Sequence, residues 1–233
     1  MKKMRIVFVF LIACSLLFSC NSSDKSPDVS GIKVELSSRR FEQDLFKLDT
    51  ANFTTNLDQL LAKYPSFGEN YLSATLNADP KWSADSAADY VTGFITAYKP
   101  VYDSAQKVFK DFDKYEKEIK QALQFVKHYF PAYKDRKQII TYIGPLDGYG
   151  DILSDDAIII GLQHHLGKSF SLYRSALVQE TYPEYISNRF EPDYIPVEFF
   201  IISFLKLFES LLFSFIEGDF SFLGRGEVSL KLW

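Results

Sequence analysis

The sequence has few of the residues that form cross-links or bind metals, with two cysteines and three histidines among 233 residues. Cys14 lies inside an N-terminal apolar stretch, which leaves Cys20 alone, and a single cysteine cannot form an internal disulfide. The sequence also lacks an excess of positive charge: 26 Lys and Arg against 30 Asp and Glu give a net charge of −4. The chain is therefore neither a disulfide-stapled scaffold nor, without a basic stripe, a nucleic-acid-binding protein.

Familiar catalytic motifs are missing as well. The sequence has no glycine-rich phosphate loop and no Gly-x-Ser-x-Gly elbow. A zincin needs two histidines spaced i and i+4 on a helix with a glutamate beside the first, whereas His164 and His165 are adjacent and His128 is far upstream. Adjacent side chains diverge by about 100 degrees on a helix and about 180 degrees on a strand. We therefore expect no catalytic residue and no metal site, and His164 and His165 are the only metal ligands that the sequence suggests.

Four aspartates lie in the glycine-containing segment that precedes the histidine pair. They are Asp147, Asp151, Asp155 and Asp156. A calcium loop has oxygen ligands at alternating positions and a closing glutamate, and this segment has neither. We interpret these aspartates as turn residues whose side chains accept local backbone hydrogen bonds, with a cation site as the alternative.

The N-terminus has the features of an export signal. Lys2, Lys3 and Arg5 precede an apolar stretch, residues 6–18, that is shorter than the roughly 20 residues of a membrane-spanning helix. We assign residues 1–19 to a signal peptide. Leu17-Phe18-Ser19-Cys20 is similar to a bacterial lipobox, which predicts lipidation of Cys20 with palmitate-type acyl chains. The alternative is a plain signal peptide with an incidental cysteine.

The polar residues 20–31 then form a flexible tether, so we expect an exported protein anchored to a membrane of the cell envelope by its N-terminal lipid. Which membrane and which face it occupies stays open.

Periodic patterns predict a helix-rich α+β domain over residues 32–196. Helices are expected over 41–48, 54–64, 83–98 (ended by Pro100) and 101–130, and an interrupted helix over 173–189. A strand is expected over 32–36, and residues 137–162 contain two β-branched runs that predict two strands of one small sheet.

Several short motifs, in order, carry a resemblance to a known family. They are Ile32-Lys33-Val34-Glu35-Leu36, Arg40-Phe41-Glu42-Gln43-Asp44-Leu45-Phe46, Tyr64-Pro65-Ser66-Phe67, Ile160-Gly161-Leu162-Gln163-His164-His165-Leu166-Gly167, Tyr182-Pro183-Glu184-Tyr185-Ile186 and Arg189-Phe190. With the lipobox, they resemble the gliding-motility lipoprotein GldB family of Bacteroidetes over about residues 1–196.

The resemblance implies a cell-envelope lipoprotein required for gliding motility, in bacteria where gliding is linked to type IX secretion. It also implies a distant kinship with zincin-like peptidases whose metal-binding helix has degenerated. We expect a non-enzymatic protein without a cofactor that binds envelope partners of the gliding machinery, with Tyr173, Tyr182 and Tyr185 as candidate interface residues. The alternative is a zincin-like, metallopeptidase-related hydrolase acting in the envelope.

Residues 197–233 differ in composition from the rest of the chain. Phenylalanine stands at positions 199, 200, 204, 208, 213, 215, 220 and 222, and the apolar positions leave no clean polar stripe. Glu198, Lys206 and Glu209 oppose membrane insertion, since one central charge costs about 2.5–3.5 kcal/mol. The pattern therefore does not predict a packed helix, and we expect a frameshifted or truncated terminus, with a membrane-associated helix as the alternative.

Overall fold

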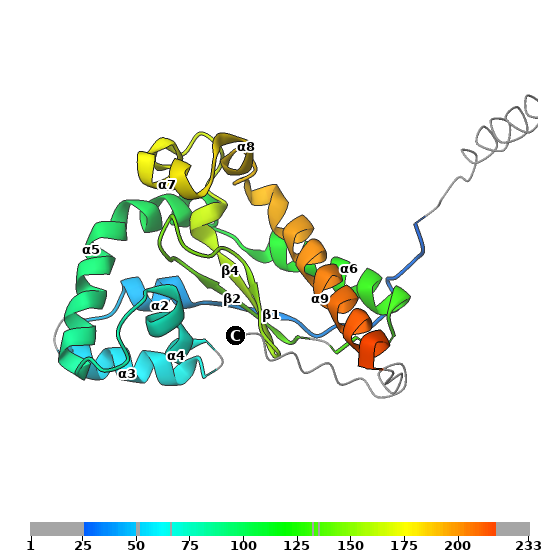
Figure 1. Cartoon of the computed structure of the whole chain (residues 1–233), viewed down its shortest axis with the longest axis horizontal. Coiled ribbons are helices and arrows are strands. Elements are labelled where there is room, and N and C mark those ends of the chain that lie inside the picture. The colour runs from blue at the N-terminus through cyan, green and yellow to red at the C-terminus, as the bar shows by residue number, and fades with distance from the viewer. Residues whose placement is uncertain (1–25, 50–51, 66, 132, 135, 218–233) are drawn as a thin grey trace, which may run out of the picture. The chain divides into compact units, whose positions relative to one another are not determined.

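The computed structural model describes residues 26–49, 52–65, 67–131, 133–134 and 136–217 (Figure 1). The chain divides into two units, Met1–Gly31 and Ile32–Trp233. The predicted signal peptide, Cys20 and residues 218–233 lie outside the described residues. All of the described helices and strands belong to the second unit.

The second unit is rich in helices and contains one small sheet. The strands are β1 (Ser37–Arg40), β2 (Gln138–Tyr142), β3 (Ile152–Leu153) and β4 (Ala157–Gly161). The α-helices are α2 (Phe41–Phe46), α3 (Phe53–Lys63), α4 (Gly68–Asn70), α5 (Ala84–Val108), α6 (Asp113–Tyr129), α7 (Ala176–Thr181), α8 (Glu184–Ser187) and α9 (Ile195–Glu217). Shorter turns are the π-helix η2 (Tyr71–Thr75) and the 3-10 helices η3 (Leu162–His164), η4 (Ser171–Arg174) and η5 (Pro192–Tyr194). This architecture confirms the predicted α+β class.

The four strands lie in the order β1-β2-β4-β3. Strands β1, β2 and β4 are parallel neighbours, and β3 runs antiparallel to β4 at the edge of the sheet. Alternate residues of β2 and β4 point to opposite faces, so the sheet separates two hydrophobic clusters. Ile139, Ile158 and Ile160 belong to one cluster, and Ile140, Tyr142 and Ile159 belong to the other.

Different helices cover the two faces of the sheet. On the first face α6 contributes a stripe at helical spacing, Tyr115, Ile119, Leu123 and Val126, and α9 runs alongside α6 (Figure 1). On the other face Tyr64, Phe67 and Tyr71 pack edge to face around Phe41, and the rings of Phe67 and Tyr71 also contact that of Tyr142. Edge-to-face pairs of this kind stabilise a core beyond the area that they bury.

Three expected elements differ in extent from the structure, and residues 137–162 contain the short strand β3 in addition to the two expected strands. Residues 32–36 are not a strand, because the backbone pairing with β2 begins only at Ser37. Pro100 lies inside α5 instead of ending it, because Val101, Tyr102 and Ala105 beyond it are buried and this packing outweighs the lost backbone bond. The single helix expected over 101–130 is two helices, which are separated by a bend at 109–112.

The Phe-rich segment also differs from expectation, because α9 is a helix with a narrow buried stripe. Ile195, Phe199 and Ser203 recur every four residues and are buried. The opposite side is apolar but exposed, and includes Phe200, Phe204 and Phe208. Because α9 is apolar on most of its sides, its buried stripe cannot be recognised from the spacing of apolar residues in the sequence. Within the described residues, none of the helices has the length and hydropathy needed to cross a membrane.

Candidate functional site

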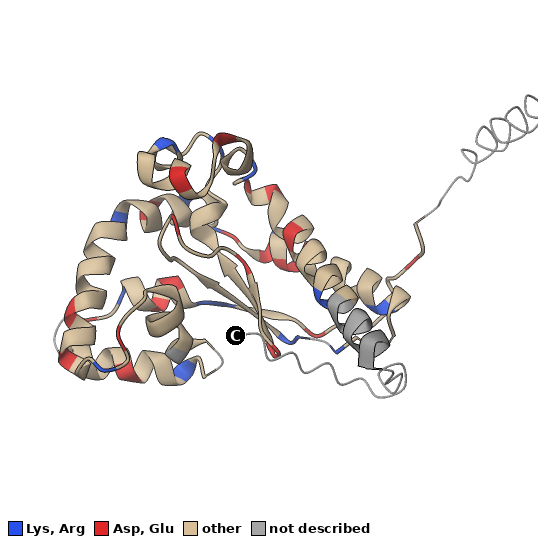
Figure 2. Cartoon of the chain, in the orientation of Figure 1, with Lys and Arg blue, Asp and Glu red and all other residues tan. Residues whose placement is uncertain are grey.

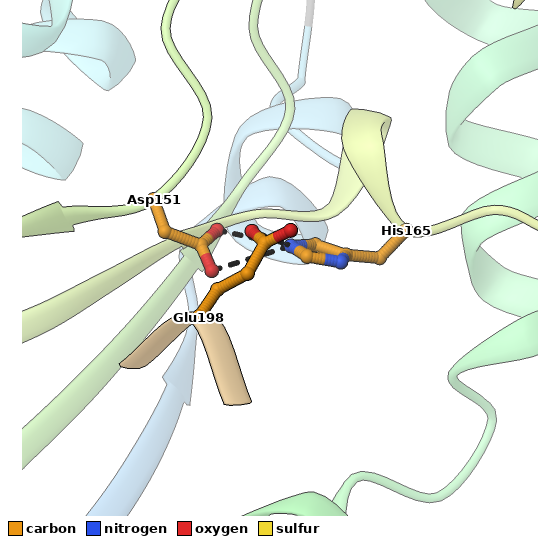
Figure 3. A group of neighbouring side chains, drawn as sticks. All are labelled: Asp151, His165 and Glu198. Carbon is orange, nitrogen blue, oxygen red and sulfur yellow. Dashed lines mark hydrogen bonds and ion pairs between the residues drawn. The ribbon is translucent and has the colours of Figure 1, made fainter. Parts of the chain in front are cut away.

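Three side chains distant in sequence meet beside the edge of the sheet. Asp151 directly precedes β3, His165 directly follows η3, and Glu198 stands in the first turn of α9 (Figure 3). Each offers one ligand-type atom, and these atoms all lie within 4.8 Å of one another. The group therefore joins one edge of the sheet to α9.

Backbone contacts at the end of β4 fix Asp151. The amide of Gly161 donates a hydrogen bond of 3.0 Å to Asp151 Oδ1. Only glycine fits at position 161, because a Cβ there would lie 2.7 Å from Gln163 Nε2 and 2.9 Å from the Gly150 carbonyl oxygen. The close approach that this glycine permits places Asp151 against the strand.

Buried polar side chains hold the loop that leads to Asp151. Gln163 accepts a hydrogen bond from the Gly144 amide at 3.0 Å and donates one to the Tyr149 carbonyl at 2.9 Å. The Tyr142 hydroxyl lies 2.8 Å from the Tyr149 carbonyl oxygen and 2.7 Å from that of Gly150. Because the Gln163 and Tyr142 side chains are buried and hydrogen-bonded, the loop has a defined conformation.

His165 is surrounded by hydrogen-bond acceptors. Its Nε2 lies 3.1 and 3.3 Å from the two carboxylate oxygens of Asp151, and its Nδ1 lies 3.4 Å from the Glu191 carbonyl oxygen. Burial of the ring opposes the charged imidazolium, but the Asp151 carboxylate outweighs it, with help from Glu198 and the Glu191 carbonyl. These groups raise the pKa of His165 above its ordinary value.

Glu198 forms the solvent side of the group. Its side chain is 34% exposed, whereas that of Asp151 is 5% exposed and that of His165 is fully buried. Burial raises the pKa of Glu198, and the Asp151 charge adds to this, while His165 and Arg189 oppose it. Glu198 Oε2 lies 3.9 Å from His165 Nε2, beyond hydrogen-bond distance.

His164 has a different role from its neighbour. Its Nε2 donates to the Leu146 carbonyl at 3.0 Å, and its ring stacks on Phe190 with centroids 4.5 Å apart. Burial lowers the pKa of His164 to about 4, so the ring is neutral at physiological pH. The two histidines diverge, as their adjacency predicts, and only His165 belongs to the group.

The remaining residues singled out in the sequence are dispersed. Of the four aspartates, Asp151 alone joins the group, while Asp147, Asp155 and Asp156 are exposed.

The tyrosines proposed as interface residues occupy three different environments. Tyr173 is 1% exposed and its hydroxyl donates to the Gln163 carbonyl, so it is a core residue, and the interface prediction for it was wrong. Tyr182 is half-buried with its hydroxyl on the Gly148 carbonyl, and Tyr185 is 73% exposed.

The sequence identified Glu198 only as a charge that opposes membrane insertion, not as a site residue. The residue stands in the Phe-rich segment of unusual composition, far along the chain from Asp151 and His165. No spacing rule links a turn aspartate, a histidine after a strand and a glutamate at a helix start. The signal that could have drawn attention to it is a single acidic residue in the first turn of an apolar helix.

The fold and the group together define a helix-rich α+β protein in which one histidine nitrogen faces two carboxylates. A family model described as gliding motility protein GldB matches residues 22–210. The chain belongs to this family of gliding motility proteins. The match includes Asp151, His165 and Glu198 and continues past Pro196 into α9. No curated protein and no solved structure matches the chain significantly.

Proposed function

We propose that the protein is a cell-envelope lipoprotein required for gliding motility, and that it works by binding envelope partners of the gliding machinery, not by catalysis. The observation that carries this proposal is the family match over residues 22–210. The lipobox-like Leu17-Phe18-Ser19-Cys20 supports an N-terminal lipid anchor in the membrane.

The local roles of the two histidines support binding over catalysis. His164 is neutral and stacked on Phe190, with its Nε2 bonded to a backbone carbonyl. His165 is fully buried with both ring nitrogens facing acceptors. A general base needs a free ring nitrogen within reach of a substrate proton, and both rings are engaged in contacts within the fold.

Deletion of the gene followed by complementation tests the proposal, and the deletion strain should not glide. The full-length gene should restore gliding, and Cys20→Ala should release the protein from the membrane fraction and abolish gliding. Crosslinking in living cells should then recover envelope proteins with the wild type and not with a strain lacking the gene. Full gliding by the deletion strain contradicts the requirement, and acyl labelling retained in Cys20→Ala contradicts the anchor.

The alternative function is a zincin-like, metallopeptidase-related hydrolase acting in the envelope. One observation favours it: a histidine and two carboxylates converge at a partly open position. Hydrolysis of a peptide substrate by the purified full-length protein, lost in Glu198→Gln at unchanged folding, would establish this alternative. The binding proposal instead expects no turnover by either protein.

A further inference from the structure

We propose that Asp151, His165 and Glu198 bind one divalent transition-metal cation of the zinc class, which fastens the start of α9 to the edge of the sheet. This site goes beyond the proposed function, since a cation that joins two elements requires no catalysis. It rests on the convergence of three ligand types on one point, as Figure 3 shows.

The separations between the ligand atoms match those around a small cation. Zinc binds nitrogen and carboxylate oxygen at about 2.0–2.2 Å, so two ligands in tetrahedral geometry are about 3.3–3.6 Å apart. His165 Nε2 is 3.1 Å from Asp151 Oδ1 and 3.9 Å from Glu198 Oε2. These two distances lie on either side of the ideal separation, and all three ligand atoms lie within 4.8 Å of one another, so side-chain adjustment would bring them around one ion.

Backbone groups provide the outer hydrogen bonds that a metal site needs. A ligating histidine usually donates its other ring N–H to a carbonyl or a carboxylate, which fixes the tautomer. Here the Glu191 carbonyl lies 3.4 Å from His165 Nδ1, so a proton on Nδ1 leaves the Nε2 lone pair directed at the carboxylates. The Gly161 amide likewise orients Asp151 through Oδ1.

Charge and access also suit a divalent ion. Two ionised carboxylates and a neutral imidazole carry a charge of −2, which a divalent cation balances. Acidic residues gather where α9 begins, as Glu191, Asp193 and Glu198, and Figure 2 shows acidic segments in red near this end of the helix. The partly exposed Glu198 side chain gives an ion access, and the solvent side can supply a water as the fourth ligand.

The ligand types indicate which metals bind. One imidazole with two carboxylates suits zinc and its first-row neighbours, whereas magnesium and calcium prefer oxygen ligands alone. The rival interpretation is a metal-free ion pair in which His165 Nε2 carries a proton and donates a hydrogen bond to Asp151. A proton and a metal cannot occupy the same lone pair, so the two interpretations give opposite results in a binding experiment.

The test is a zinc titration of the full-length protein, purified in detergent and stripped with a chelator. Calorimetry should give one saturable site per chain, and magnesium should not compete. Glu198→Gln should weaken zinc binding by at least the roughly 10–100-fold lost on removing an outer-shell partner. Glu191→Gln is the matched control, since it removes a nearby carboxylate but keeps the backbone carbonyl on His165, and it should bind zinc as the wild type does.

Two further results separate this site from adventitious zinc. Cobalt bound to the wild type should give the visible absorption of a low-coordinate nitrogen and oxygen site, and His165→Gln should abolish it. Zinc bound equally by the wild type and Glu198→Gln, or no saturable binding by the wild type, overturns the proposal. Because Glu198 is partly exposed, Glu198→Gln keeps the test decisive even if His165→Gln or Asp151→Asn fails to fold.

Discussion

Carboxylates are buried at both edges of the sheet, and their surroundings differ. Beside β1, the Glu42 side chain is fully buried, and its two oxygens accept hydrogen bonds of 2.6 Å from Arg40 Nε and from the Thr141 hydroxyl. Beside β3, Asp151 is bonded to His165, but Glu198 stops 3.9 Å short of the same imidazole. The first centre pairs one carboxylate with one cation, whereas the second has two carboxylates for one histidine.

The difference separates a structural pair from a site that can bind a ligand. A buried charge that is paired and hydrogen-bonded needs no further partner. Two carboxylates that share one imidazole leave negative charge uncompensated, and the Asp151 charge adds to the burial that raises the pKa of Glu198. Substitutions at the first centre should therefore change stability, whereas substitutions at the second should change the response to a cation.

Breaking the Glu42 centre should have the largest effect. Glu42→Ala leaves the Arg40 guanidinium without its buried partner, and removal of one member of such a pair costs about 3–5 kcal/mol. Urea unfolding of the full-length protein, followed by circular dichroism, measures the loss in the free energy of unfolding.

The control for Glu42→Ala is Asp103→Ala, which breaks the exposed pair between Lys99 and Asp103. A surface pair contributes about 0–1 kcal/mol, so this variant should unfold almost as the wild type does. Equal losses in the two variants would contradict the structural role of the Glu42 centre.

Zinc binding at the second centre should give the next largest change, a rise in the free energy of unfolding. A ligand that binds only the folded state at 100 times its Kd adds about 2.7 kcal/mol to the free energy of unfolding. Thermal unfolding with and without zinc measures this as a rise in Tm. Glu42→Ala should still respond to zinc and Glu198→Gln should not, and the reverse pattern would place the ion at the wrong edge of the sheet.

Alkaline pH should weaken the aromatic core that lies between the two centres. Burial raises the pKa of the Tyr71 phenol, to which the Glu42 charge adds, and it raises the pKa of Tyr142, to which the Asp151 charge adds. Above about pH 10 the unfolded chain releases these protons while the folded chain keeps them, so stability falls by about 1.4 kcal/mol per pH unit for each tyrosine.

Urea unfolding between pH 9 and 11 measures this slope. Tyr71→Phe keeps the ring but removes the titrating hydroxyl, which donates to the Ile143 carbonyl at 2.8 Å. The variant is therefore less stable at neutral pH but should lose stability less steeply as the pH rises. An identical slope in the variant and the wild type would show that Tyr71 ionises normally in the fold.

Much of this fold could be predicted because its signals are local. The apolar run of β4, buried at every position, and the periodic stripe of α6 identify their elements without tertiary information. Continuation of α5 through Pro100 could not be predicted in this way, because the burial of Val101 and Ala105 that favours it comes from packing. The late start of β1 at Ser37 likewise depends on its partner strand.

The candidate site was predictable only in part, for a related reason. The divergence of His164 and His165 follows from their adjacency, and Asp151 stands out in the sequence beside its glycines. Which residues meet in the site depends on tertiary structure. Gly161 brings Asp151 to His165, and packing of α9 on the domain brings Glu198 to them. In addition, the unusual composition of residues 197–233 led us to expect a terminus that does not belong to the fold, so Glu198, which completes the group, was not considered as a site residue.

The smallest effect is expected for Glu198→Gln in the absence of metal. The side chain is 34% exposed and lies beyond hydrogen-bond distance of His165, so little attraction is lost. Removing its charge also relieves repulsion with Asp151, which opposes that loss. The free energy of unfolding should therefore change by no more than about 0.5 kcal/mol, as for an ordinary surface substitution.

Urea unfolding in the presence of a chelator makes the measurement, with Glu191→Gln as the control. A loss of about 2 kcal/mol or more would mean that Glu198 already holds His165 as an imidazolium, and the two edges of the sheet would then be alike: each would carry a closed ion pair, with no place for a cation.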